Sequence, residues 1–127
     1  MADKNKRIRI FVVDVEKQET RLDSTDCSLE DLHRLINCDT IDIVTREIGG
    51  KPYAIICDDN GLLNQRTYSA ISPEGAVRLV GNLVISNFDE NGDLARLTGD
   101  DEKRLMRALR TARDYDGKEY YVIMLDN

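Results

Sequence analysis

The sequence predicts an α+β fold in which one mixed, mostly antiparallel sheet, built from hairpins, carries two amphipathic helices packed on it. Three observations predict this class. Apolar, β-branched segments recur between turns rich in Gly, Asp and Asn; two segments begin with helix-capping residues; and most connections between the strand segments are short. The chain has 127 residues, close to the commonest domain size, so we expect a single domain over 1–127.

The clearest strand signal is a hairpin formed by residues 41–48 and 52–58. Gly49 and Gly50 lie between the two segments and supply the positive φ angles that a tight turn requires. Asp58-Asp-Asn-Gly61, hereafter the DDNG turn, follows directly. The other predicted strands are 7–15, a short returning strand at 19–22, 82–88 with a partner ending near Leu97, and 119–125.

Residues 62–80 give weak signals for either type of element. Within them, Ser72, Pro73 and Glu74 indicate one helical turn at most, because Pro is favoured in the first turn of a helix.

The first predicted helix begins at Ser28, whose hydroxyl can cap a first-turn amide while Asp31 reaches back in a capping box. Asn37 is expected to end this helix. The apolar residues that follow Ser28 at helical spacing are Leu29, Leu32, Leu35 and Ile36.

The second predicted helix begins at Thr98 and has acidic residues in its first turn. Basic residues follow them, which complements the helix dipole. Its predicted buried stripe consists of Leu105, Leu109 and Ala112.

Charge and cysteine content limit the partners and the compartment. The net charge of −6 disfavours sequence-independent binding to nucleic acid or to anionic lipid. Three widely spaced cysteines, without a CxxC pair, are typical of a reducing compartment. Since the sequence has neither a signal-peptide pattern nor an apolar stretch of membrane-spanning length, we expect a cytoplasmic protein.

Several short segments together resemble the uncharacterised domain of unknown function 3846, a family found in phages and mobile elements of Gram-positive gut bacteria. They are the SLEDLHRLI helix, IDIV, YAIICDDNGLL, Asn64 with Arg66, VGNLVIS and the LTGDDEKRL helix start. The resemblance covers residues 8–110 and implies an accessory protein of a phage or mobile element. It brings no catalytic residue and no cofactor with it.

A binding surface is predicted around Asp59, Asn64, Arg66 and Tyr68, in the loop after the DDNG turn. A loop that leaves a rigid hairpin can hold side chains in fixed positions. These residues offer a carboxylate, an amide, a guanidinium group and an aromatic ring, which suit oriented polar recognition. The alternative surface is a basic face of the last helix, formed by Lys103, Arg107 and Arg110.

These observations favour a non-enzymatic binding module whose partner is an unidentified protein or small molecule. The sequence contains none of the common catalytic motifs, and we expect neither a metal site nor a cofactor. One alternative is a small cysteine-dependent enzyme that pairs the only histidine, His33, with Cys27, Cys38 or Cys57. Another is an anti-restriction or anti-defence factor that acts through an acidic surface.

Overall fold

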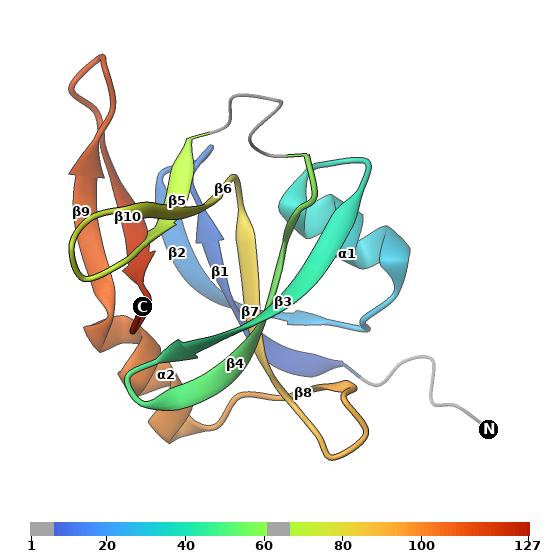
Figure 1. The fold of residues 1–127 in the computed structure, drawn as a ribbon. Helices are drawn as coiled ribbons and strands as arrows, with labels where there is room; N and C mark the ends of the chain where they lie inside the picture. The colour runs from blue at the N-terminus through green and yellow to red at the C-terminus, as the bar shows by residue number, and fades with distance from the viewer. Residues whose placement is uncertain (1–6, 61–66) are drawn as a thin grey trace.

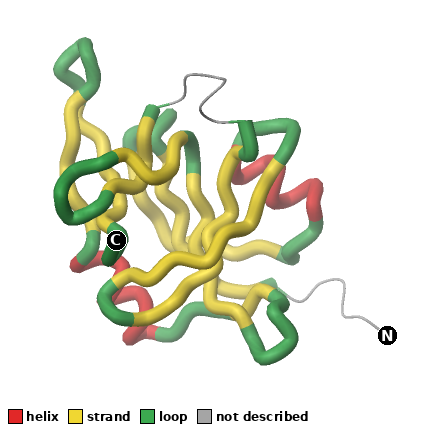
Figure 2. The backbone as a smooth tube through the Cα atoms, in the orientation of Figure 1, coloured by secondary structure: helices red, strands yellow, loops and turns green. Residues whose placement is uncertain are grey.

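The part of the chain that the structure describes forms two sheets and two helices, shown as a ribbon in Figure 1 and as a tube in Figure 2. The structure is a computed structural model that describes residues 7–60 and 67–127. Its elements are β1 (Ile8–Asp14), β2 (Glu19–Thr25), α1 (Leu29–Ile36), β3 (Ile41–Ile48), β4 (Lys51–Asp58), β5 (Tyr68–Ile71), β6 (Val77–Val80), β7 (Leu83–Phe88), β8 (Leu94–Ala95), α2 (Gly99–Arg107), β9 (Leu109–Arg113) and β10 (Glu119–Met124).

The predicted α+β class and antiparallel hairpins are confirmed, but the single sheet is wrong. The larger sheet has the strand order β2-β1-β7-β4-β3, with β8 paired to β7. A second sheet has the order β6-β5-β10-β9, in which β10 and β5 run parallel. The difference arises in residues 67–80, because β5 pairs with β6 on one side and with β10 on the other, and neither strand extends the larger sheet.

The suggestion of a helical turn at Ser72 is also wrong, because this segment is the turn between β5 and β6. The Ser72 amide donates to the carbonyl of Ala76 at 2.8 Å, and the Gly75 amide donates to the Ser72 carbonyl at 2.9 Å. Gly75 has a φ of 88°, which closes a hairpin and does not continue a helix.

The predicted tight turn and the start of the first helix are confirmed. Gly49 and Gly50 adopt φ angles of 61° and 86° between β3 and β4. Ser28 caps α1 by accepting the Asp31 amide at 3.1 Å, and Asn37 ends the helix in the left-handed conformation. Only half of the predicted capping box forms, because the Asp31 carboxylate accepts the Thr25 hydroxyl at 2.6 Å.

The second helix begins as predicted and ends earlier. The Thr98 hydroxyl accepts the Asp101 amide at 3.3 Å, and the Thr98 amide donates to the Asp101 carboxylate at 2.9 Å, which completes a capping box. The helix ends at Arg107. Leu109 and Ala112 therefore do not belong to a helical stripe; they lie in β9, opposite Ile123 and Tyr120 of β10.

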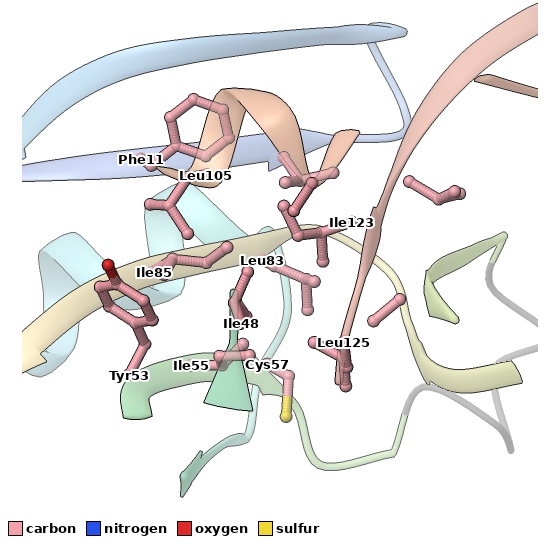
Figure 3. Packing of buried hydrophobic residues seen from close by; sticks show 14 of the residues in the cluster. Phe11, Ile48, Tyr53, Ile55, Cys57, Leu83, Ile85, Leu105, Ile123 and Leu125 are labelled. Atoms are coloured by element: carbon pink, nitrogen blue, oxygen red, sulfur yellow. The ribbon is translucent and has the colours of Figure 1, made fainter. Parts of the chain in front are cut away.

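The central strands of the larger sheet, β1, β7 and β4, are buried on both faces. Phe11 and Val13 join the core between the two sheets, whereas Ile10 and Val12 pack with α1 on the opposite face. Figure 3 shows how side chains from β1, β4, β7, α2 and β10 meet in the inter-sheet core. Those labelled are Phe11, Ile48, Tyr53, Ile55, Cys57, Leu83, Ile85, Leu105, Ile123 and Leu125.

The core position of Leu105 gives a direct test of how α2 packs. Its side chain is fully buried, so Leu105→Ala should lower the free energy of unfolding by about 2–5 kcal/mol. The adjacent Met106 is 58% exposed, so Met106→Ala should change it by less than about 0.5 kcal/mol. Urea denaturation followed by far-UV circular dichroism measures both. Equal effects of the two substitutions would show that α2 does not pack through Leu105.

Candidate functional site

The DDNG turn begins where β4 ends, and the neighbouring start of β3 holds its first residues in place. The Asp59 amide donates to the Thr40 carbonyl at 3.1 Å, and the Asn60 side-chain amide donates to the Thr40 hydroxyl at 2.9 Å. The Asp58 carboxylate accepts the Asn60 amide at 2.9 Å and is buried. Asp59 is exposed. The Asp59 carboxylate is thus exposed to solvent, while hydrogen bonds to Thr40 and Asp58 fix the backbone that carries it.

A cleft opens beside this turn, between the β3–β4 hairpin of the larger sheet and β6 of the smaller one. We call it the sheet–sheet cleft; its volume is about 500 Å³, within the range of small-ligand sites. Its lining residues are Asp42, Val44, Arg46, Cys57, Asp58, Asp59, Asn60, Val77, Arg78, Leu79 and Val80.

The cleft combines an aliphatic surface with charges of both signs. Val44 and Leu79 pack against the inter-sheet core and form part of the aliphatic lining. Arg46 and Arg78 contribute guanidinium groups, and Asp59 contributes a carboxylate. A site of this kind can bury an aliphatic group and orient it through charged groups of both signs.

Hydrogen bonds within the chain occupy part of the outer edge of β3, next to the cleft. The Asp59 amide donates to the Thr40 carbonyl, so in the antiparallel register the even-numbered residues of β3 form the hydrogen bonds to β4. The backbone amides and carbonyls of the odd-numbered residues therefore point away from β4. The outward Ile43 amide donates to the Asp42 carboxylate at 2.9 Å, and the Arg46 guanidinium donates to the outward Thr45 carbonyl at 2.9 Å. These bonds disfavour the addition of a strand to β3 and favour recognition through the side chains of the cleft.

A second pocket lies on the α1 side of the same turn. It contains His33 and one of the three cysteines with which His33 was predicted to pair. His33 and Cys38 both line it, and Asp58 and Asn60 are shared with the sheet–sheet cleft. The Cys38 thiol donates to the Thr40 carbonyl at 3.1 Å. The structure therefore places Cys38 and His33 at one pocket, whereas Cys57 lines the sheet–sheet cleft.

Of the four predicted binding residues, the structure describes Asp59 and Tyr68 and places them at different pockets. Asp59 lines the sheet–sheet cleft. Tyr68, at the start of β5, lines a different pocket, where its ring packs edge-on against Tyr120 with 5.7 Å between the ring centroids. Asn64 and Arg66 lie outside the described residues.

The alternative basic face is not a continuous helical surface. Lys103 and Arg107 are exposed on α2, as predicted, but Arg110 belongs to β9. Its guanidinium donates to the Arg107 carbonyl at 2.8 Å and to the Leu109 carbonyl at 2.7 Å. Arg110 therefore satisfies carbonyl groups at and just after the C-terminal end of α2, where a cation is favoured.

Sequence reasoning missed the charged residues contributed by β3 and β6. Asp42, Val44 and Arg46 alternate along β3, so their common face could have been found from the period of two. Arg78 had no comparable signal, because its strand lies in the weakly patterned segment 62–80.

In the part of the chain that the structure describes, no helix is long and apolar enough to cross a membrane. Among the same residues, no group of three or more His, Cys, Asp or Glu side chains is arranged to hold a metal ion.

Comparison with known proteins gives one match. The model of a family described as a domain of unknown function, DUF3846, matches residues 8–110. No curated protein and no solved structure matches the chain.

The environment of two cysteines predicts slow alkylation of the folded protein. Burial raises the pKa of the Cys57 thiol to about 11, so roughly one molecule in a thousand carries its thiolate at pH 8. Burial, together with Asp26 and Asp31, also raises the pKa of Cys27. Iodoacetamide labelling followed by mass spectrometry should therefore show slower modification of both residues in the folded than in the denatured protein, with rates that rise with pH. Faster labelling of either residue than of a free thiol at pH 7 would contradict this.

Proposed function

Since the chain belongs to the DUF3846 family, whose description assigns no activity, we propose from its geometry that it is a non-enzymatic binding module whose ligand occupies the sheet–sheet cleft. The observation that carries this proposal is the juxtaposition, in one cleft, of an aliphatic lining with guanidinium and carboxylate groups from β3, β6 and the DDNG turn. Such a site selects by shape and charge together.

The ligand is a protein segment or a small molecule with an aliphatic part and charged groups of both signs. Its anionic group would meet Arg46 or Arg78, and its cationic group would meet Asp59. Because hydrogen bonds within the chain occupy part of the edge of β3, a bound peptide would be recognised mainly through its side chains. The resemblance to proteins of phages and mobile elements supports an accessory role in such an element.

The second candidate is a cysteine-dependent enzyme in the α1-side pocket. The observation that favours it is that His33 and Cys38 line the same pocket, whose lining also includes Asp58. The two candidates predict different results for Cys38→Ser, which should leave ligand binding in the sheet–sheet cleft unchanged and should abolish a cysteine-dependent reaction.

Two exposed arginines provide a matched test of the cleft. A ligand would first be identified by affinity capture from a cell lysate and by a fragment screen, and its binding then measured by calorimetry. Arg78→Ala should weaken binding about tenfold or more, because it removes a charge-assisted hydrogen bond from the cleft.

Arg107→Ala is the control, because Arg107 is exposed on the rival basic face of α2. It should leave the dissociation constant within about twofold of the parent value, since it removes no contact to the ligand. If Arg107→Ala weakened binding while Arg78→Ala matched the parent protein, the proposed site would be wrong.

A further inference from the structure

We propose that a second ligand site, for a planar aromatic ring without a phosphate group, lies between the start of β5 and the β9–β10 hairpin. The pocket there, which we call the hairpin pocket, has a volume of about 460 Å³. It is lined by Thr67, Tyr68, Arg113, Asp114, Tyr115 and Tyr120. Three of the five tyrosines of the chain thus gather at one pocket.

Tyr115 is the residue that the fold does not explain. It lies in the turn of the β9–β10 hairpin, which extends away from the body of the protein in Figure 1. The turn itself is formed by Asp114, whose carboxylate accepts the amides of Asp116 and Lys118 at 2.9 Å, and by Gly117 with a φ of 79°. The Tyr115 side chain is fully exposed, so its ring contributes no burial to folding.

The other two rings form a fixed wall of the pocket. Tyr68 and Tyr120 meet edge to face, with an interplanar angle of 74°. Tyr120 is only 3% exposed, and burial together with a hydrogen bond to Tyr68 raises the pKa of its hydroxyl. Because the buried Tyr120 holds the partly exposed Tyr68 ring in place in the unbound protein, a ligand that stacks on Tyr68 would not have to order that ring first.

The charges around the hairpin pocket favour a ring without phosphate. The guanidinium of Arg113 forms an ion pair with Glu119 at 3.3 Å, and the Asp114 carboxylate lies in the pocket lining. The net charge of the whole chain is −6, which further disfavours a polyanion. Aromatic rings bind on tyrosine faces through stacking, which does not require a charge on the ligand.

This site is independent of the sheet–sheet cleft, because the lining residues of the two pockets do not overlap. The proposal therefore goes beyond the binding function inferred for the cleft, and either site can exist without the other.

Two-dimensional ¹H–¹⁵N NMR titration of the full chain with adenosine, with AMP and with N-acetylphenylalanine amide tests the proposal. Adenosine or the phenylalanine amide should shift the backbone amide signals of Thr67, Tyr115 and Tyr120 in a saturable manner. Whichever of these two probes has the lower dissociation constant shows whether the natural ligand carries a nucleobase or an aromatic side chain. AMP should bind no more tightly than adenosine.

Tyr115→Ala should weaken binding of the preferred probe about tenfold, the typical cost of losing one stacked aromatic ring. Because Tyr115 is fully exposed, this variant should keep the thermal melting curve of the parent protein. Tyr121→Ala is the matched control: Tyr121 is 41% exposed in β10 and adjacent to Tyr120, whose side chain points to the opposite face of the strand. It should leave binding unchanged.

Three outcomes would overturn the proposal. The first is that neither ring probe shifts these amide signals in saturable fashion. The second is that Tyr115→Ala binds as the parent protein does, or that Tyr121→Ala weakens binding equally. The third is that AMP binds tenfold more tightly than adenosine, because the phosphate, and not the ring, would then determine recognition.

Discussion

The arrangement of the two sheets depends on the hydrogen bonds that the buried carboxylate of Asp101 accepts from the larger sheet. This carboxylate is almost fully buried and accepts the Lys51 ammonium at 2.6 Å, the Tyr53 hydroxyl at 2.7 Å and the Asn87 side-chain amide at 2.7 Å. Burial alone would raise the pKa of this carboxyl, but hydrogen bonds from Lys51, Thr98, Tyr53 and Asn87 outweigh that effect and hold the pKa far below its usual value. One side chain thus joins α2 to β4 and β7 of the larger sheet.

The position of α2 determines the position of the second sheet, and hence of the cleft. β9 follows α2 almost directly, pairs with β10, and through β10 reaches β5 and β6, the strand that forms one wall of the sheet–sheet cleft. A second set of hydrogen bonds joins the segment after β10 to the β3–β4 hairpin of the larger sheet. The Asp126 carboxylate accepts the amides of Gly49 and Gly50 at 2.9 and 2.8 Å, and the Asp126 amide donates to the Glu47 carbonyl at 2.9 Å. The β3–β4 wall and the β6 wall of the cleft are therefore both connected to β10, the first through Asp126 and the second through β5.

The sequence predicted the elements that depend on local chemistry and missed those that depend on distant pairing. The Thr98 cap and the Gly49–Gly50 turn are set by neighbouring residues, so their patterns were sufficient. The 3–4 residue spacing that continues to Leu109 suggested a longer helix, but pairing with β10 makes that segment a strand. In the sheet–sheet cleft, too, only residues with a local sequence signal could be predicted. Asp59 was found from its turn, whereas Arg78 reaches the cleft through a strand that has no strong local pattern.

The central claim is most directly tested by the free energy of unfolding of Asp101→Asn and of the parent protein, measured by chemical denaturation from pH 7 down to pH 2. At pH 7 the substitution should cost about 1.5–3 kcal/mol, because it replaces charge-assisted hydrogen bonds to a buried carboxylate, while the Lys51 side chain is 40% exposed and solvent screens much of its lost ion pair. The folded-state pKa of Asp101 is depressed, so its contribution is present above the unfolded-state pKa, about 3.9, and is lost as the pH falls toward the folded-state value. The difference between the two proteins should therefore shrink below about pH 4. A difference under about 0.5 kcal/mol at pH 7, or one that does not change with pH, would contradict the role assigned to Asp101.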